Sequence, residues 1–323
     1  KETFMSIDKP INESIIGIDV AKDKLDLYFS YDNSYAIYEN TDKGLKQLIK
    51  VLNKSNFDGM MILEATGGYE RLSHTLLTDA GFKVHIAHPK RVHHFILQKG
   101  YYGKTDKSDA KALAEFGLQE SVCATPSKDK IQSEQQDLAA SRTQLLSMLT
   151  AEKCRLKEHL SLSTKQSIKR SIKILEKEMN KIELKLNKNI EADKDAYEKF
   201  NLLMTYKCVG PITAMILLCA LPELGSLNRK EVACLCGLAP RNRDSGKKKG
   251  KRVTYGGRGD VRKALYMAAL SGIKYNPILK AFYEKLKQAG KPAKVCLTAV
   301  MRKVIITLNA MLRDKKEWVC STN

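Results

Sequence analysis

Residues 129–200 contain no proline and no glycine, and this uninterrupted stretch limits what the whole chain can fold into. Proline and glycine are the residues that most strongly interrupt helices. The apolar residues from Ile168 to Ile190 step by three, four and seven, which is typical of amphipathic helices. We therefore predict two long helices that break around 161–165 and separate the other two regions of the chain.

This helical region has two interpretations. It is either a solvated spacer or a coiled-coil arm through which two copies of the chain pair. We favour the arm, because two isolated helices of this length would leave their apolar stripe exposed to water. The chain then divides into an N-terminal domain over residues 1–125, a coiled-coil connector over 126–200 and a C-terminal domain over 201–323.

Most of the charge of the chain lies in its last third. The formal net charge is +20, and over the three regions it is −1, +4 and +17. A positive charge this strong and local predicts a polyanionic partner, with nucleic acid the leading candidate. A hydrophobic content of 43% excludes a disordered chain.

No segment has the pattern of a membrane span or a signal peptide. The most apolar run, 212–221, is about half the length that a bilayer requires. The first ten residues carry charges and no apolar core. We expect no membrane partner and a cytoplasmic protein, associated with the nucleoid when it is bound to DNA.

The first 125 residues alternate strand and helix patterns. We expect strands at 14–20, 24–30 and 35–38, a helix from Thr41, a strand at 60–63, a helix over 69–80, a strand at 83–86 and a helix over 105–119. A three-stranded meander followed by alternating helices and strands is the element order of the ribonuclease H and RuvC-like fold. The sequence therefore predicts an α/β domain of this class.

Four carboxylates stand at the ends of these predicted elements. Asp19 ends the first strand, Glu64 follows the strand at 60–63, and Asp106 and Asp109 share one face at the start of the last helix. An oxygen-rich cage of this kind suits Mg²⁺ or Mn²⁺. Two such ions about 4 Å apart would clamp the attacking and leaving oxygens of a phosphoryl transfer. One aspartate at a strand end commonly only caps a turn, so the prediction depends on all four.

A basic segment in the last third surrounds Ser245. Between Arg241 and Lys263 ten side chains are basic and two are acidic. One interpretation is a loop that binds phosphates without reading sequence. The other is that guanidinium and ammonium groups neutralise the transition state of an attack by Ser245 on a phosphodiester. The predicted nucleic-acid contacts, one of them from the N-terminal domain, are Lys104, Arg241, Arg243, Lys247, Lys248, Lys249, Lys251, Arg252, Arg258, Arg262 and Lys263.

The rest of the C-terminal region reads as mainly helical. It opens with Gly210-Pro211, which marks either a helix-hairpin-helix that binds a phosphate or an ordinary turn between helices. The eight cysteines include no Cys-x-x-Cys pair. We expect reduced, packed thiols, with Cys234, Cys236 and the single Trp318 in the core.

Four histidines between 85 and 94 are close enough in sequence to suggest a metal site. No cysteine accompanies them at the spacing of a zinc site. We therefore favour packing within helices and loops, or contact with RNA.

Several motifs occur in a fixed order along the chain. They are Ile16-Gly-Ile-Asp19, Glu64-Ala-Thr-Gly-Gly-Tyr-Glu70, Lys104-Thr-Asp106-Lys-Ser-Asp109, Val209-Gly-Pro-Ile-Thr-Ala214, Cys236-Gly-Leu-Ala-Pro240, Asp244-Ser245-Gly246 and Gly259-Asp-Val-Arg262. Over nearly its whole length the chain resembles the DEDD transposases of insertion sequences, the one-ten family of bridge-RNA-guided recombinases.

The resemblance implies specific roles. Asp19, Glu64, Asp106 and Asp109 would hold Mg²⁺ or Mn²⁺, and Ser245 would be the nucleophile that forms a covalent phosphoserine with DNA. Members of the family form tetramers, as dimers of dimers. They recognise the DNA sequence through a structured bridge RNA that pairs with donor and target DNA.

Two other functions stay open from the residues alone. A RuvC-like metal-dependent nuclease would cut branched DNA by hydrolysis, with Ser245 as an ordinary loop residue. A basic scaffold protein without catalysis is disfavoured by the four placed carboxylates.

Overall fold

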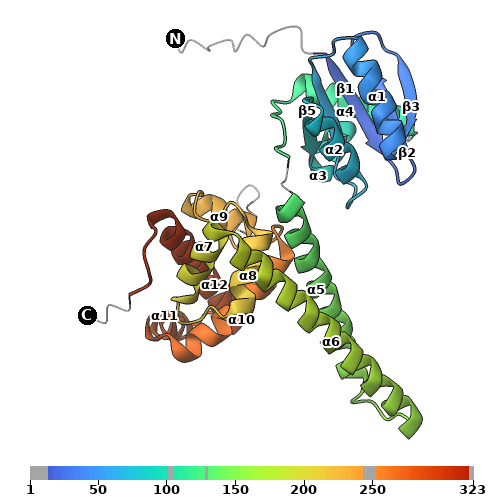
Figure 1. Cartoon of the computed structure of the whole chain (residues 1–323). Helices are drawn as coiled ribbons and strands as arrows, with labels where there is room; N and C mark the ends of the chain where they lie inside the picture. Colours follow the sequence, from blue (N-terminus) through green and yellow to red (C-terminus); the bar gives the residue numbers. More distant parts are fainter. Residues whose placement is uncertain are drawn as a thin grey trace, which may run out of the picture. The chain divides into compact units, whose positions relative to one another are not determined.

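The computed structural model describes residues 14–100, 103, 105–127, 130–242, 244, 250 and 252–319 (Figure 1). The chain forms two compact units, Lys1–Lys128 and Asp129–Asn323. Unit 1 contains β1 (Ile15–Val20), β2 (Lys24–Phe29), β3 (Tyr35–Glu39), α1 (Asp42–Lys54), β4 (Met60–Glu64), α2 (Glu70–Asp79), β5 (Lys83–Ala87), α3 (Pro89–Gln98) and α4 (Asp106–Gln119).

The strands of unit 1 form one mixed sheet in the order β3-β2-β1-β4-β5. The first three strands pair antiparallel, and β4 and β5 run parallel to β1. A meander extended by two parallel strands on the other side of β1 is the topology of the ribonuclease H fold. The predicted fold class of this unit is confirmed.

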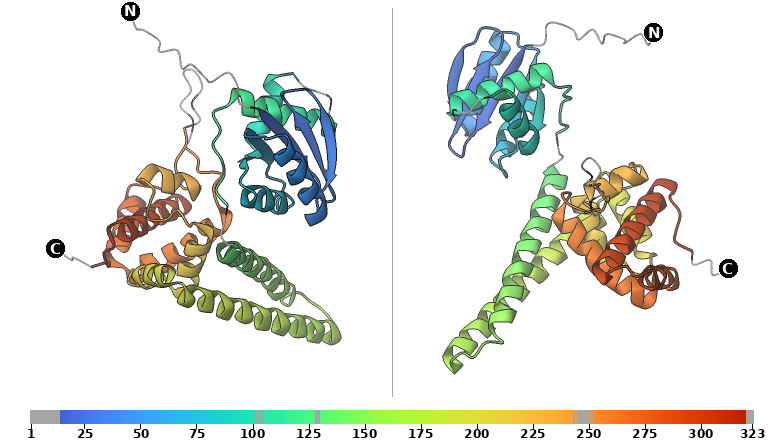
Figure 2. Two further views of the ribbon diagram at one scale, coloured as in Figure 1. Left: turned by 45° about the horizontal axis from the view of Figure 1, so that its top comes forward. Right: turned by 180° about the vertical axis from the view of Figure 1, so that it is seen from behind.

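Helices cover both faces of the sheet (Figures 1 and 2). One face buries Ile16, Ile18 and Leu63 against α1 and α2. The other buries Ile15 and Ile62 against α3 and α4. Because successive side chains of a strand point to opposite faces, strands with apolar residues on both sides belong in the middle of such a sandwich.

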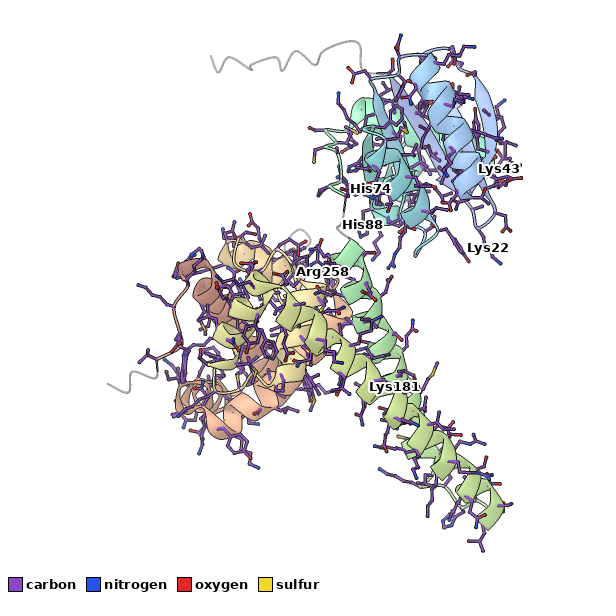
Figure 3. The ribbon with its side chains drawn as sticks, viewed as in Figure 1. Lys22, Lys43, His74, His88, Lys181 and Arg258 are labelled. Carbon is purple, nitrogen blue, oxygen red and sulfur yellow. The ribbon has the colours of Figure 1, made fainter. Side chains whose placement is uncertain are left out.

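Helix α3 is the element that the sequence analysis missed. Its N-cap is His88, whose Nδ1 accepts a hydrogen bond from the backbone N–H of Lys90 at 3.1 Å (Figure 3). Pro89 at the first helical position was the available signal. His85 instead contacts the carbonyl oxygen of Cys123 through Nδ1, at 2.8 Å. Within the described residues these histidines form no metal site.

Unit 2 consists of helices. They are α5 (Lys130–Arg155), α6 (Leu162–Ala192), α7 (Lys194–Met204), α8 (Pro211–Ala220), α9 (Arg229–Leu235), α10 (Gly259–Tyr275), α11 (Pro277–Gln288) and α12 (Ala293–Asp314). The predicted mainly helical character of the C-terminal region is confirmed. Gly210 is the N-cap of α8 and makes no side-chain cap, a geometry compatible with both interpretations of the Gly-Pro turn.

The two long helices of the connector lie side by side (Figure 2). Three ion pairs cross between them: Glu134–Lys185 at 2.5 Å, Arg142–Glu183 at 2.7 Å and Lys153–Glu176 at 2.8 Å. The break falls a few residues before the predicted one, because Ser161 caps α6 and accepts a hydrogen bond from Thr164 N–H. The predicted pair of long helices is confirmed.

The core of unit 2 is built around α10 and α12. Of the helices that the structure describes, α12 is the one with the length and apolar composition of a membrane span. Its Val304, Ile305 and Leu308 are fully buried in the core of the unit. Packing among the surrounding helices accounts for its apolar composition.

The cysteine and tryptophan predictions are partly right. Cys236 is buried, and burial raises the pKa of its thiol to about 12. Cys234 is exposed, so its predicted core position is wrong. It lies on the outer side of the short helix α9. Trp318 is partly buried, with its ring 5.1 Å from that of Tyr206.

Candidate active site

The two strand-borne carboxylates of unit 1 lie on one face of the sheet, at one end of it. β1 pairs with β4 so that Gly17 stands opposite Ile62, and the same register continued by two residues sets Asp19 beside Glu64. Since side chains alternate, Asp19 shares the face of Gly17 and Glu64 shares the face of Ile62. That is the face covered by α4.

Helix α4 approaches β1 closely because Gly17 has no side chain. A Cβ atom at this position would lie 2.0 Å from the carbonyl oxygen of Ala110 and 2.4 Å from the backbone nitrogen of Ala114. Neither backbone atom can move without moving the helix. The glycine of the Ile16-Gly-Ile-Asp19 motif therefore sets the distance between α4 and the strand that carries Asp19.

The start of α4 is fixed by a capping box. Thr105 accepts a hydrogen bond from the N–H of Ser108 at 3.1 Å, and the Ser108 hydroxyl accepts one from the N–H of Thr105 at 2.9 Å. Such reciprocal caps stop a helix end from fraying. The first turn held in this way carries Asp106 and Asp109.

The charges of these carboxylates affect one another. Burial raises the pKa of Asp19, and the negative charges of Asp109, Asp106 and Asp26 raise it further, to about 6. Like charges have this effect only at short range. The charge of Asp19 is therefore coupled to those of both aspartates of α4, and the strand register sets Glu64 beside Asp19. Their catalytic role remains a prediction.

Asp26 is a fifth carboxylate that the sequence analysis did not include. It lies on β2 directly opposite Asp19, and it is fully buried. The hydroxyl of Tyr35 donates a hydrogen bond to its Oδ1, which raises the pKa of Tyr35 to about 12. The Nζ atom of Lys24 lies 3.0 Å from Oδ2 of Asp26 and 2.6 Å from Oδ2 of Asp106. The alternation of charged and apolar residues at 24–27 was the available signal.

The chain beyond Glu64 is tied down by Glu70. Glu70 accepts hydrogen bonds from the backbone N–H and the hydroxyl of Thr66, at 3.1 and 2.9 Å, and from the N–H of Gly68, at 2.8 Å. Burial opposes its ionisation, but hydrogen bonds from the backbone at Glu70 and Gly68 and from Thr66 outweigh it and lower its pKa. Bonds to an ionised acceptor are strong, so Glu70 fixes the loop that follows β4.

The chemistry of the four predicted ligands fits Mg²⁺ or Mn²⁺. Carboxylate oxygens are the ligands that these hard cations prefer, and a divalent ion would neutralise the repulsion that raises the pKa of Asp19. Among the residues that the structure describes, no three acidic, histidine or cysteine side chains are drawn together at metal-binding distances. The ammonium group of Lys24 supplies a positive charge between Asp26 and Asp106 instead.

Ser245 lies outside the described residues, but both ends of its loop are described. Arg241 and Val253 form an antiparallel bridge with backbone hydrogen bonds of 2.8 and 3.1 Å. Asp244 Oδ1 accepts a hydrogen bond from the N–H of Gly250 at 2.9 Å. The segment that contains the predicted nucleophile is therefore closed into a loop at Arg241 and Val253.

Two glycines, one before and one after this segment in sequence, pack backbone against backbone. Gly237 and Gly257 have φ angles of +65° and +68°. A Cβ atom at Gly257 would lie 2.1 Å from the backbone nitrogen of Gly237. The N–H of Arg258 donates to the carbonyl oxygen of Leu235 at 2.8 Å. Only glycine combines this backbone conformation with such a close approach, so these motifs fix the base of the Ser245 loop.

Two of the predicted nucleic-acid contacts, Arg258 and Arg262, are bonded to carbonyl oxygens inside unit 2. Arg258 forms two bonds of 2.6 Å with the carboxylate of Glu223 and one of 2.9 Å with the carbonyl oxygen of Ala220 (Figure 3). Arg262 donates to the carbonyl oxygen of Gly256. Both guanidinium groups therefore brace the base of the loop, a role that the sequence analysis did not assign.

The remaining predicted contacts divide into two groups. Arg241, Arg252 and Lys263 are exposed, and Arg241 lies over the ring of Tyr255 at 4.6 Å. Its guanidinium group also donates long hydrogen bonds to the Tyr255 hydroxyl, at 3.4 Å, and to Cys234 Sγ, at 3.5 Å. The predicted contacts outside the described residues are Lys104, Arg243, Lys247, Lys248, Lys249 and Lys251.

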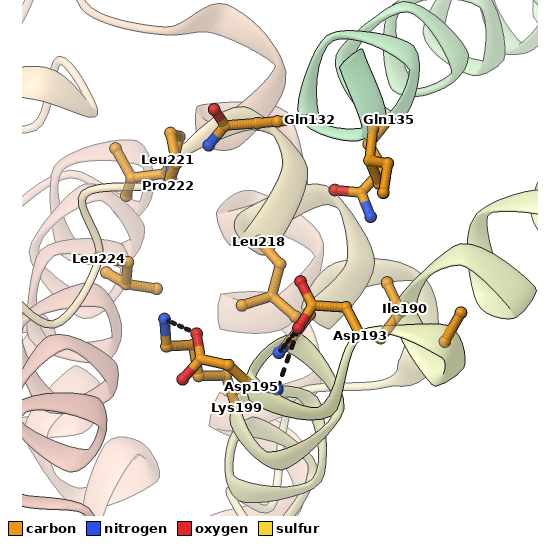
Figure 4. A pocket seen from close by; sticks show the side chains of 13 residues that line it. Gln132, Gln135, Ile190, Asp193, Asp195, Lys199, Leu218, Leu221, Pro222 and Leu224 are labelled. Carbon is orange, nitrogen blue, oxygen red and sulfur yellow. Dashed lines mark hydrogen bonds and ion pairs between the residues drawn. The ribbon is translucent and has the colours of Figure 1, made fainter. Parts of the chain in front are cut away.

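A cavity of about 490 Å³ opens in unit 2 where α5, α7 and α8 meet (Figure 4). Its lining mixes apolar and polar side chains, and its acidic side chains have internal partners. Asp193 caps α7 by accepting hydrogen bonds from the N–H groups of Asp195 and Ala196, and Asp195 pairs with Lys199 at 2.5 Å. These contacts are structural, and they do not point to a ligand.

Comparison with known proteins finds relatives that match nearly the whole chain. The chain is 27% identical over 316 residues to the pilin gene-inverting proteins of Moraxella bovis and Moraxella lacunata, and each match covers 95% of this chain and 98% of the relative. Among solved structures, RuvC of Thermus thermophilus in complex with a Holliday junction substrate matches 35% of this chain and 100% of its own length. That match has 12% identity and a TM-score of 0.26.

Family models match both units. A model for the DEDD transposase domain of IS110 elements matches residues 16–164, and a model for transposases of the IS116/IS110/IS902 family matches residues 200–284. Together the two segments cover more than half of the chain, in the order in which the motifs occur. The chain therefore belongs to this transposase family and is an enzyme of DNA transposition or recombination.

Proposed function

We propose that the chain cleaves and exchanges DNA strands through a covalent phosphoserine at Ser245, with Mg²⁺ or Mn²⁺ held by Asp19, Glu64, Asp106 and Asp109. The metal site is supported by the strand register that sets Asp19 beside Glu64 on the sheet face that α4 covers, with Asp106 and Asp109 in the first turn of that helix. The pKa of Asp19 is raised to about 6, so its ionisation is disfavoured in the folded chain. A cation bound beside it would favour the ionised carboxylate.

The chemistry at Ser245 balances without a cofactor that supplies energy. Its Oγ attacks the scissile phosphorus, an Oγ–P bond forms, and the bond from phosphorus to the 3′ oxygen breaks. The hydroxyl proton passes to the departing 3′ oxygen. A 3′ hydroxyl of another strand then attacks the phosphoserine and returns a proton to Ser245. The phosphodiester is conserved throughout, consistent with a sequence that contains no Walker A phosphate loop.

The protein contributes charge and position to this reaction. A divalent ion at the carboxylates would stabilise the charge on the departing oxygen. Exposed Arg241, Arg252 and Lys263 would neutralise phosphates near the loop. Arg258 and the glycine contacts beneath the loop would hold its ends at a constant separation.

We infer that the partners are donor and target DNA, a structured bridge RNA and further copies of the chain. Apolar side chains on the outside of the helical pair support self-association: Ile174 and Leu184 are 63% and 64% exposed. A dimer of dimers would cover them. Sequencing the RNA that co-purifies with the expressed chain tests the RNA partner, and a heterogeneous pool without a defined structured species would contradict it.

Trapping tests the nucleophile. The substrate is DNA that carries the ends of the element encoding this chain, with the co-purified RNA present. We expect a protein–DNA adduct that survives denaturant, its loss in Ser245→Ala, and its retention in Ser226→Ala, which removes an exposed hydroxyl elsewhere in unit 2. Asp109→Asn should remove cleavage while the chain stays folded.

The same experiment separates the alternatives. If Ser245→Ala nicks DNA at the parental rate and the parent forms no adduct, the chain is a hydrolytic nuclease. If cleavage needs no divalent ion and survives both Asp106→Ala and Asp109→Ala, the metal site is wrong.

A further inference from the structure

Lys24 occupies an unusual place among the carboxylates of unit 1. Its ammonium group contacts two of them, Asp26 on its own strand and Asp106 on α4. Asp26 is two positions away in sequence and Asp106 is 82 positions away, so the contact with Asp106 exists only in the folded unit. Hydrogen bonds to Asp106 and to Asp26 raise the pKa of Lys24, which therefore stays protonated.

The two carboxylates that Lys24 contacts differ in burial. Asp26 has no exposed side-chain surface, whereas the side chain of Asp106 is 56% exposed. A buried carboxylate that lost its cation would keep an uncompensated charge, which is costly. An exposed ion pair contributes little and is readily exchanged. The hydrogen bond to Asp106 is the shorter contact, 2.6 Å against 3.0 Å for the ion pair with Asp26, but Asp106 can exchange it for water whereas buried Asp26 cannot.

We propose that Lys24 is a built-in counter-cation of the carboxylate site: it holds Asp106 in the metal-free protein and must release Asp106 before a divalent ion can bind there. The inference rests on the metal site proposed above. One oxygen of Asp106 cannot serve both the ammonium group and the metal, so the two contacts compete. Lys24 keeps its bond to Asp26 in both states and acts as a positioning residue.

If Lys24 competes with the metal, its replacement should change the affinity for a divalent ion in the opposite direction from the change expected if Lys24 supports the site. Replacing Lys24 by methionine keeps a long apolar stem but removes the competing charge, so binding of a divalent ion should become tighter. A lysine that only supported the site would give weaker binding when replaced. Lys24→Arg retains the positive charge and should stay near the parent. Lys43→Met removes the same charge from α1, on the opposite face of the sheet (Figure 3).

The test is a titration of the full chain with Mn²⁺ after removal of metal with a chelator, without nucleic acid, followed by calorimetry or by the electron paramagnetic resonance of free Mn²⁺. We expect Lys24→Met to bind Mn²⁺ about fivefold more tightly than the parent or better, the lower end of typical coupling between sites. Lys43→Met should match the parent. Equal or weaker binding by Lys24→Met would overturn the inference. Absence of Mn²⁺ binding in the parent and every variant would instead remove the metal site itself.

A second measurement needs no variant. Amine labelling of the parent with a succinimidyl ester, read out by peptide mass spectrometry, reports how accessible each lysine is. Mn²⁺ should increase the labelling of Lys24 and leave that of Lys43 unchanged, because the ion would displace the ammonium group from Asp106. Mn²⁺ binding that leaves the labelling of Lys24 unchanged or lowers it would contradict the competition.

Discussion

The carboxylate face of unit 1 and the base of the Ser245 loop in unit 2 are positioned by different physical means. In unit 1, strand register sets Asp19 beside Glu64 and Asp26, and a glycine lets α4 bring Asp106 into reach. In unit 2, no sheet exists to impose a register on the described residues. The loop ends are held by one β-bridge, two glycines in contact and the ion pair of Arg258 with Glu223.

This difference explains which sequence signals were easy to interpret. A single aspartate at a strand end commonly caps a turn, but four carboxylates at the ends of successive elements form a pattern that the sequence shows directly. A basic residue near a loop has two uses, to bind a phosphate or to brace the chain, and the sequence does not separate them.

The single tryptophan provides a way to follow the unfolding of the two units separately. Trp318 packs in unit 2, so its fluorescence reports on that unit.

The largest effect is expected for Gly17→Ala in unit 1. The added methyl group would meet backbone of α4 at 2.0 and 2.4 Å, so the helix must shift, at a cost of about 3 kcal/mol. Circular dichroism should show an earlier thermal transition while the transition of Trp318 fluorescence stays unchanged. Gly259→Ala is the control, since a Cβ there meets nothing within 4 Å. Equal stability of Gly17→Ala and the parent would show that α4 does not lie on β1 in this way.

A smaller effect is expected for Gly257→Ala in unit 2. The residue has a positive φ and a contact of 2.1 Å to the backbone of Gly237, which together should cost about 2 kcal/mol. Here the fluorescence transition of Trp318 should move to lower temperature. Gly290→Ala also has a positive φ but no close neighbour, and it separates the cost of conformation from that of the contact. A fluorescence shift no larger than that of Gly290→Ala would mean that the contact is unimportant.

Arg258→Met tests whether this arginine braces unit 2 or binds DNA. Loss of its bonds to Glu223 and Ala220 should destabilise the unit by about 1.5 kcal/mol. The salt dependence of DNA binding should stay the same. If the log–log slope instead falls by about 0.9, Arg258 contacts a phosphate.

Asp19→Asn should stabilise the metal-free chain at neutral pH. The pKa of Asp19 is about 6 in the folded chain against 3.8 for the free group, so the folded chain binds this proton more tightly than the unfolded chain. Ionisation of Asp19 therefore costs stability, a cost that develops as the pH rises from about 4 to 6 and is complete above that range. With partial exposure taken into account, we expect a gain of about 1 kcal/mol at pH 8.

Chemical unfolding at several pH values checks this prediction. The gain in stability from Asp19→Asn should disappear below about pH 4, where Asp19 is protonated in both the folded and the unfolded parent chain. A gain that did not depend on pH would have another cause. Mn²⁺ should stabilise the parent and not the variant.

The smallest change in stability is expected for simultaneous replacement of Lys247, Lys248 and Lys249 by glutamine. These lysines should affect only binding, because each phosphate contact that is lost lowers the salt slope by about 0.9 on duplex DNA. The same substitutions at Lys285, Lys287 and Lys291, which are exposed around the turn between α11 and α12, are the charge-matched control. An unchanged slope in the first variant would show that this run faces solvent.

Local sequence patterns were sufficient for most of unit 1. Period-two alternation predicted its strands, and capping residues such as Thr41 and Thr105 predicted helix starts. Helix α3 was missed because its cap is a histidine and its first residue a proline. Asp26 and Lys24 were missed because their importance comes from Asp19 on β1 and Asp106 on α4, which local pattern does not connect.

The sequence by itself determined the class of the protein. The order of its motifs, the uneven charge and the proline-free and glycine-free stretch define a carboxylate-bearing α/β unit followed by a basic helical one. Only the tertiary structure decided which charges act on which. Three features depend on short separations between residues far apart in the chain. They are the raised pKa of Asp19, the contact of Lys24 with Asp106 and the bonds of Arg258 to Glu223. Electrostatic energy varies steeply over such distances, and periodicity along a sequence carries no information about them.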